Sequence, residues 1–98
     1  MCSSDLFVAD PAGTVRAVPL DRIVDGPVHF IKIDAEGMEL EVLEGATRIV
    51  RESRPKIMIE VFNAHAGAFA SWLAANRYRI YREFKYVNAA TILIEPAP

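Results

Sequence analysis

Two apolar segments that flank one amphipathic helix constrain the fold of this chain more than any other feature. Residues 28–33 (VHFIKI) and 56–62 (KIMIEVF) are rich in β-branched residues and have the length of strands. Residues 38–53 between them have helical spacing, and their apolar face consists of Leu40, Leu43, Ala46 and Val50. A strand, a helix and a strand in this order predict two parallel strands with a right-handed connection.

Charged residues and helix breakers predict where this helix starts, divides and ends. Acidic residues gather at its start and arginines at its end, as the helix dipole favours: Glu36, Glu39 and Glu41, then Arg48, Arg51 and Arg54. Gly45 weakens the middle of the helix, so we expect a division into two pieces there. Pro55 prevents continuation.

The remaining segments predict short elements before the first main strand. Residues 15–18 form a strand candidate, and residues 20–24 form one helical turn that Asp21 could cap. We expect strand 28–33 to be buried on both faces, as in a parallel sheet, with His29 packed inside it.

The last third of the chain predicts a helix and a hairpin. Residues 66–76 have helical spacing, with Phe69, Trp72 and Leu73 on one side. Residues 78–84 and 90–94 read as two strands joined by a short connection, which makes them antiparallel neighbours. The fold class is therefore α/β.

Composition excludes several classes of protein. Eleven basic and thirteen acidic side chains give a formal charge of −2, which supplies no electrostatic footprint for nucleic acids or anionic membranes. Cys2 is the only cysteine, so no internal disulfide and no cysteine-based zinc site is expected, and a cytoplasmic location fits.

No apolar run reaches the roughly 20 residues of a membrane helix. Residues 1–10 lack the features of a signal peptide, and we interpret them as a non-native or disordered segment before a domain of residues 11–98.

Candidate catalytic residues gather where the parallel strands should end, which is where open α/β sheets bind ligands. Asp34 and Glu36 directly follow strand 28–33, and Glu60 lies within the apolar run of the second strand. Glu60 could open onto a crevice or pair with Lys32 on the neighbouring strand, and Glu36 could equally serve the helix dipole. Asp34 caps nothing obvious, so a catalytic and a structural role both remain open.

His65 is the fourth candidate, because it follows the second strand by a few residues. A histidine at this rim could act as a general base for a hydroxyl near neutral pH, although loop histidines are often only solvated. The carboxylates match no calcium loop and no common zinc motif, so we predict no metal site. No two of the five glycines stand in G-x-G spacing, so no nucleotide-cradling loop is expected.

The run from Phe30 to Ala46 (FIKIDAEGMELEVLEGA), with Leu20-Asp21 before it and RPKIMIEV after it, resembles the FkbM family of S-adenosylmethionine-dependent methyltransferases. The resemblance implies a Rossmann-like class I methyltransferase sheet, of which this chain holds strands four to seven, the last two as an antiparallel hairpin. It also implies that Asp34, Glu36 and Glu60 line the acceptor side of the active site.

The activity that the resemblance implies is O-methyl transfer to a hydroxyl of a small molecule or glycan, with S-adenosylmethionine as cofactor. The family's glycine-rich loop and ribose-binding acid have no counterpart in this sequence. We therefore expect a truncated, C-terminal half of the domain that does not bind the cofactor alone, and its cofactor-binding residues stay unassigned. The alternative is an inactive half-domain that self-associates. In either case strand 28–33 is expected to be a free edge through which the chain forms a homo-oligomer.

Overall fold

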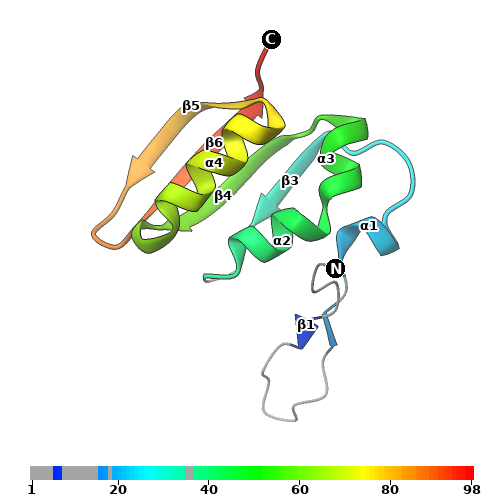
Figure 1. Cartoon of the computed structure of the whole chain (residues 1–98), viewed down its shortest axis with the longest axis horizontal. Coiled ribbons are helices and arrows are strands. Elements are labelled where there is room, and N and C mark those ends of the chain that lie inside the picture. Colours follow the sequence, from blue (N-terminus) through cyan, green and yellow to red (C-terminus); the bar gives the residue numbers. More distant parts are fainter. Residues whose placement is uncertain (1–5, 8–15, 18, 35–36) are drawn as a thin grey trace.

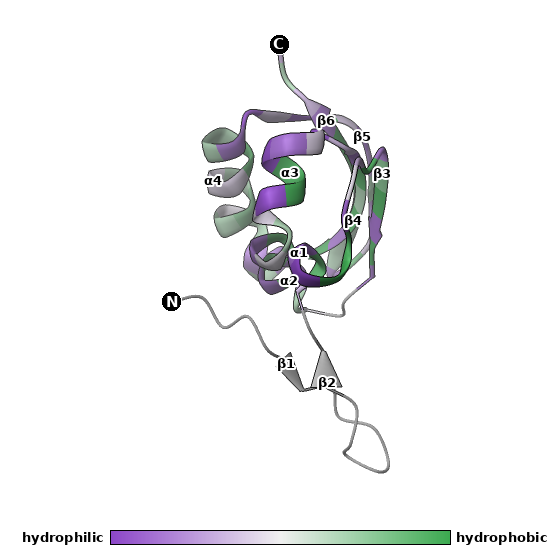
Figure 2. Ribbon diagram, turned by 90° about the vertical axis from the view of Figure 1, so that its right-hand side faces the viewer, coloured by the Kyte–Doolittle hydropathy of each residue, from purple (hydrophilic) through white to green (hydrophobic). Residues whose placement is uncertain are grey.

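A four-stranded mixed sheet with helices packed on one face forms the main body of the protein (Figures 1 and 2). The structure, a computed structural model, describes residues 6–7, 16–17, 19–34 and 37–98. The strand order is β3-β4-β6-β5. These strands span Phe30–Ile33 (β3), Lys56–Phe62 (β4), Tyr78–Lys85 (β5) and Ala89–Pro96 (β6).

The pairing of the strands confirms the predicted α/β fold class. Strands β3 and β4 are parallel, with Ile31 opposite Ile57 and Ile33 opposite Ile59. Strand β6 runs antiparallel to both of its neighbours, so the closing hairpin places the last strand between β4 and β5. The carboxyl ends of β3 and β4 consequently lie at the same edge of the sheet.

The described part of the chain has four α-helices: α1 precedes the main sheet, α2 and α3 connect β3 to β4, and α4 connects β4 to β5. They are α1 (Leu20–Ile23), α2 (Glu39–Gly45), α3 (Thr47–Ser53) and α4 (Ala66–Asn76), and the 3₁₀ turn η1 (Asn63–His65) precedes α4. Two further short strands, Leu6–Phe7 (β1) and Arg16–Ala17 (β2), pair antiparallel outside the main sheet. Strand β2 lies within the predicted strand 15–18, whose end residues are outside the described part. No helix among the described residues is long and apolar enough to cross a membrane.

The division of the long helix at Gly45 is confirmed, and a close contact explains it. Helix α2 ends at Gly45 and α3 begins at Thr47. A Cβ at residue 45 would lie 2.9 Å from the Cβ of Pro19, closer than real Cβ contacts allow. Glycine is therefore required where the helix passes the chain entering α1. Helix α3 ends at Ser53, and its C-cap residue Arg54 has a left-handed φ of 50° before Pro55.

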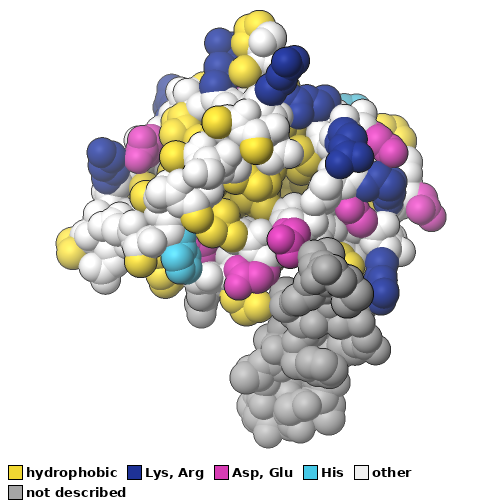
Figure 3. All heavy atoms as spheres, in the orientation of Figure 1, with side chains coloured by type: hydrophobic (Ala, Val, Ile, Leu, Met, Phe, Trp, Pro, Cys, Tyr) yellow, Lys and Arg dark blue, Asp and Glu magenta, His cyan; other side chains and the backbone are white. Residues whose placement is uncertain are grey.

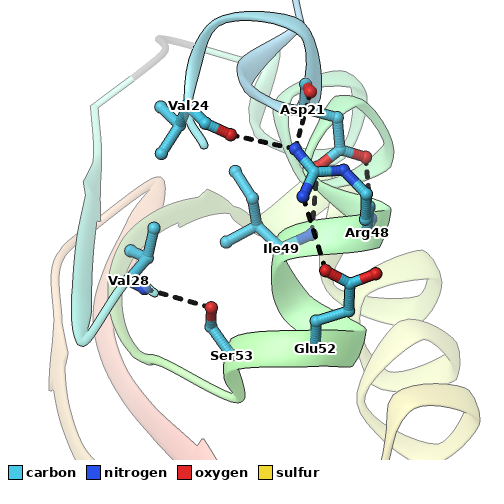
Figure 4. A network of polar contacts seen from close by, with 7 residues as sticks. All are labelled: Asp21, Val24, Val28, Arg48, Ile49, Glu52 and Ser53. Atoms are coloured by element: carbon cyan, nitrogen blue, oxygen red, sulfur yellow. Dashed lines mark hydrogen bonds and ion pairs between the residues drawn. The ribbon is translucent and has the colours of Figure 1, made fainter. Parts of the chain in front are cut away.

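Asp21 was predicted to cap its own helical turn, and the structure shows a different role (Figure 4). Helix α1 has no side-chain cap. The carboxylate of Asp21 instead accepts hydrogen bonds from the backbone N–H groups of Arg48 and Ile49, at 2.7 and 3.0 Å. Asp21 thus binds free N–H groups at the start of α3, 27 residues further along the chain.

Strand β3 differs from its prediction in both length and burial. It starts at Phe30 rather than Val28, because the N–H of Val28 donates to the side chain of Ser53 at 3.0 Å. Ile31 and Ile33 are buried, whereas Phe30 is 51% exposed and Lys32 is exposed. The strand is therefore buried on one face only, because the helices of the described part of the chain cover the same side of the sheet (Figure 2). His29 lies before the strand and is exposed, so its predicted packing is wrong.

The hydrophobic core lies between the sheet and helices α2, α3 and α4. The sheet contributes alternate residues, among them Ile57, Ile59 and Ile94, none of which is exposed. Leu43 and Ile49 from the helices meet them there. Tyr78 at the start of β5 is also buried, and its hydroxyl donates to the carbonyl of Pro55 at 2.8 Å.

Candidate active site at the carboxyl ends of the parallel strands

At the edge of the sheet where β3 and β4 end (the rim), the turns that follow these two strands lie beside the start of α2. Asp34 follows β3, η1 follows β4, and α2 begins at Glu39. Gly37 has a φ of +95°, which a side chain would disfavour, and this conformation leads the chain into α2. The parallel pairing of the strands therefore places the beginning of α2 beside the turn that carries His65.

Glu39 and His65 form the central contact of this rim. The Oε2 atom of Glu39 lies 2.8 Å from Nδ1 of His65 and also accepts a hydrogen bond from the N–H of Phe62 at 3.2 Å. Glu39 has no exposed surface, whereas 38% of the His65 side chain is exposed. The imidazole also stacks on the Phe62 ring, with the ring planes 8° apart. A buried carboxylate thus holds a half-exposed histidine in one orientation.

The carboxylate of Glu39 is ionised at neutral pH despite its burial. Burial is the largest single influence and raises its pKa, because a charge is poorly solvated in the interior. The hydrogen bonds from His65, from its own backbone N–H and from Phe62 act in the opposite direction. Together they lower the pKa of Glu39 below its ordinary value of 4.5.

An ionised carboxylate fixes the tautomer of the neutral histidine. Because Glu39 can only accept hydrogen bonds, Nδ1 of His65 must be the donor. The lone pair of the neutral imidazole then lies on Nε2, which has no hydrogen-bond partner among the described residues. Nε2 is therefore the nitrogen that can take a proton from a ligand.

His65 lines an open hollow of about 260 Å³. The other described lining residues are Gly37, Leu40, Glu41 and Glu44, so the opposite wall consists of α2 and the turn before it. On the face that Figure 3 shows, a histidine side chain lies beside acidic side chains. Among the described residues no group of three His, Cys, Asp or Glu side chains could hold a metal ion.

The three predicted residues that the structure describes, Asp34, Glu60 and His65, do not converge on one point. Asp34 lies at the rim and is exposed, but it does not line the hollow. Glu60 is half-buried on the sheet face opposite the helices, where it pairs across strands with Thr91. No ion pair joins it to Lys32, whose partner in the strand register is Met58. Glu36 lies outside the described residues.

Glu39 is the site residue that the sequence interpretation missed. Its place at the start of a helix was interpreted as complementing the helix dipole, and its complete burial and its contact with His65 give it a further role. A signal was present in the spacing. Glu39 precedes Leu43, Ala46 and Val50 at intervals of four, three and four residues, which places it on the apolar face of the helix.

Comparisons with known proteins agree with this fold. A family model for the methyltransferase FkbM domain matches residues 11–86. The crystal structure of a methyltransferase FkbM from Methylobacillus flagellatus KT superposes with a TM-score of 0.63 at 26% sequence identity. The match covers 90% of this chain but only 25% of that protein, so this chain spans about a quarter of its length. The comparison with curated proteins gives no match. The family match over most of the chain confirms the resemblance seen in the sequence, and the chain belongs to the FkbM methyltransferase family.

Proposed function

We propose that this chain supplies the acceptor side of an FkbM methyltransferase that transfers a methyl group to a hydroxyl of a small molecule or glycan. The family supports methyl transfer in general. The observation that carries the choice of a hydroxyl acceptor is the contact between Glu39 and His65 at 2.8 Å. A hydroxyl is a weak nucleophile until it loses its proton, and a neutral imidazole with a fixed tautomer is suited to remove that proton.

In the proposed mechanism His65 is the general base. The acceptor hydroxyl donates a hydrogen bond to Nε2 of His65 in the hollow between α2 and η1. A methyl donor bound by the rest of the domain would supply the methyl group and would leave as a neutral thioether when its carbon–sulfur bond breaks. His65 takes the proton of the acceptor on Nε2 as the O–H bond breaks. Glu39 stabilises the resulting imidazolium by accepting the Nδ1 hydrogen bond, as a buried carboxylate does in other histidine-based sites. Asp34 and Glu36, which adjoin this rim in the sequence, are proposed to orient the acceptor.

Glu60 is a proposed catalytic residue with a different geometry. Its carboxylate belongs to the sheet face opposite the helices and to the half-buried part of β4. It would reach an acceptor only from that face. His65 and Glu60 are therefore expected to act on different parts of a bound acceptor.

The residues described here do not fit S-adenosylmethionine, the cofactor that the family implies. Of the described residues, two carboxylate side chains and no lysine or arginine line the hollow beside His65. Its carboxylates would repel the carboxylate of the cofactor's amino-acid part, and no G-x-G loop offers backbone N–H groups. We therefore propose that cofactor binding requires a part of the domain outside these 98 residues, and we assign no cofactor-binding residue here.

A matched pair of histidine variants tests the general base. We propose a chimera in which residues 11–98 replace the corresponding segment of the solved FkbM methyltransferase, assayed by transfer of a labelled methyl group to a panel of hydroxylated acceptors. His65→Asn should lower kcat by a factor of about 10² to 10⁴, the usual contribution of a general base. His29→Asn is the control, because His29 is exposed and does not line the hollow.

Equal rates for the parent chimera and His65→Asn would overturn the proposal. A second measurement uses the 98-residue chain itself. Long-range ¹⁵N–¹H spectra should show the Nδ1–H tautomer for neutral His65. A predominant Nε2–H tautomer would also contradict the assignment, because Nε2 would then have no lone pair for a proton.

A further inference from the structure

The turn η1, which carries His65, is bonded to the closing hairpin as well as to α2. Asn63 is the first residue of η1, and its backbone N–H donates to the carbonyl of Asn88 at 2.8 Å. Its side-chain amide donates to the carbonyl of Val87 at 3.1 Å. Val87 and Asn88 belong to the turn between β5 and β6 (the hairpin turn). Two elements therefore fix η1 in place: α2 through Glu39, and the hairpin turn through Asn63.

The hairpin turn gives Asn63 a firm support. The register of β4 and β6 places Phe62 opposite Ala89, and the N–H of Tyr86 donates to the carbonyl of Ala89 at 2.7 Å, which closes the turn. Both hydrogen bonds from Asn63 end on backbone carbonyls of this closed turn. They therefore do not depend on the side chains of Val87 and Asn88, which are exposed.

Phe62, the last residue of β4, contacts every other part of the rim around His65. Its backbone N–H donates to Oε2 of Glu39 at 3.2 Å. Its ring stacks on the imidazole of His65, with the ring centroids 6.3 Å apart and the planes 8° apart. A Cβ at Gly37 would lie 3.7 Å from the Phe62 ring, so the ring also packs against the turn that leads into α2. Phe62 thus joins the histidine, its carboxylate partner and the wall of the hollow.

These contacts matter because a single hydrogen bond does not fix the orientation of an imidazole ring. Glu39 binds only Nδ1 of His65, so the ring could still turn about that atom. The stack on Phe62 restricts this turning, and the two bonds of Asn63 fix the backbone that carries the histidine. A general base must lie about 2.6–3.2 Å from the donor atom, and a misplacement of about 1 Å can lower a rate by about 10². The position of Nε2 therefore depends on all three residues.

We infer that Phe62 and Asn63 are positioning residues for the proposed methyl transfer, and that the closing hairpin takes part in it by holding Asn63. Neither residue lines the hollow at His65, so both act through the histidine and not on the acceptor. Phe62 sets the plane of the imidazole, and Asn63 sets the place of η1. The inference rests on the proposed function, because the effect of both residues on the rate is exerted by His65.

The 98-residue chain allows a test that needs neither cofactor nor catalysis. At a pH where His65 is neutral, NMR spectra report the exchange of its Nδ1–H with water and the ratio of its two tautomers. Phe62→Leu and Asn63→Ala should each speed this exchange about tenfold and let the Nε2–H tautomer appear, because the bond to Glu39 is held less firmly. Phe62→Tyr keeps the ring and should behave as wild type. Asn88→Ala removes an amide on the other side of the same contact that has no hydrogen bond among the described residues, and it should change neither signal.

Double variants in the chimera distinguish positioning from a merely structural role. Phe62→Leu and Asn63→Ala should each lower kcat about tenfold and leave KM within about twofold, because they misplace the base without touching the acceptor. Combined with His65→Asn, neither should lower kcat any further, because the group through which they act is already gone. A structural role would lower the rate in both backgrounds. Equal losses with and without His65, or no loss in either single variant, would overturn the inference. Asn63 is exposed, so Asn63→Ala keeps the test decisive if Phe62→Leu does not fold.

The two measurements separate this inference from the proposed function. Equal methyl transfer by the parent chimera and His65→Asn would refute the general base, whereas faster Nδ1–H exchange in Phe62→Leu and Asn63→Ala would still show that these residues hold His65. Unchanged exchange in both variants would refute the positioning roles. Loss of methyl transfer in His65→Asn would in that case still support the general base.

Discussion

Replacing Glu39 by alanine tests whether this residue is a buried anchor or an ordinary helix-start acid. The matched control is Glu41→Ala, two positions later in the same first turn of α2. If both residues only complement the helix dipole, the two substitutions should lower the free energy of unfolding equally, by about 0.3–1 kcal/mol each. The structure predicts a difference, because Glu39 is completely buried and Glu41 is exposed.

The magnitude follows from the two hydrogen bonds that Glu39 accepts. Bonds from His65 and from the N–H of Phe62 to an ionised carboxylate contribute about 1.5 kcal/mol each at the low end, which suits the partial exposure of His65. The other oxygen, Oε1, is buried with no hydrogen-bond partner among the described residues. Burying this unpaired oxygen costs about 1 kcal/mol, which offsets part of the stabilisation from the two hydrogen bonds. We therefore expect Glu39→Ala to lower the free energy of unfolding by about 2 kcal/mol.

The pH dependence gives a second, independent signature. The pKa of Glu39 in the folded protein lies below its ordinary value of 4.5, so the contribution of the carboxylate is fully present above pH 4.5. It is lost as the pH falls through the lowered folded pKa, because protonation removes the charge that the hydrogen bonds stabilise. The difference in the free energy of unfolding between wild type and Glu39→Ala should therefore decrease as the pH falls below 4.5.

Urea unfolding followed by the fluorescence of Trp72 measures both effects. The free energies of unfolding of wild type, Glu39→Ala and Glu41→Ala are compared at pH 7 and at successive values below 4.5. The reasoning is refuted if the two variants lose equal stability at pH 7. It is also refuted if the loss in Glu39→Ala is the same at every pH.

Three further substitutions test the packing around the site. Asp21→Ala should lower the free energy of unfolding by about 1–2 kcal/mol, because it removes the cap of α3. Asp25 is an exposed acid, so Asp25→Ala should leave that free energy unchanged. Similar losses in the two variants would contradict the capping role of Asp21. Gly45→Ala should destabilise the protein, because the added carbon would lie too close to Pro19. Gly67→Ala should stabilise it by about 0.5–1 kcal/mol, because no atom lies within 4 Å of the added carbon. Thermal unfolding measures both changes, and a stabilised Gly45→Ala would contradict the prediction. Tyr78→Phe should cost about 1 kcal/mol below pH 10. Because burial raises the pKa of Tyr78 above 10.0, wild type should lose this advantage as the pH rises beyond that value.

Periodicity in the sequence predicted the elements whose shape depends on local interactions. Strand β4 and helix α4 have the predicted bounds, since their apolar spacing and the breakers beside them act within a few residues. The division at Gly45 was predictable because glycine weakens a helix wherever it occurs.

Interactions between distant residues determined what could not be predicted. The bond of Asp21 to α3 spans 27 residues, and the bond of Glu39 to His65 spans 26. The helical spacing places Glu39 on the apolar face of α2, but only the position of η1 beside α2 shows that His65 is its partner. Strand 28–33 was expected to be buried on both faces because its composition alone does not show how many helices cover the sheet.

The edge strand β3 carries the proposed self-association of the chain. Among the described strands β3 pairs only with β4, and the carbonyl of His29 accepts a hydrogen bond from Lys56 on that side. Alternate residues of a strand direct their backbone groups to the same neighbour, so the N–H and C=O groups of Phe30 and Lys32 point toward the free edge. Pairing with the same strand of a second copy would satisfy them, and Lys32 is the only charged residue of β3 that opposes it.

Substitutions at the two edges of the sheet test this association by sedimentation velocity over a range of concentrations. Phe30 on β3 and Phe84 on β5 are similarly exposed, at 51% and 47%. A lysine at either position removes a comparable apolar surface and adds one positive charge, but only Phe30→Lys places that charge on the edge that we expect to pair. Wild type and Phe84→Lys should therefore sediment as dimers or larger species at concentrations where Phe30→Lys is a monomer. A monomeric wild type at all concentrations, or dissociation by Phe84→Lys instead, would show that β3 is not the interface.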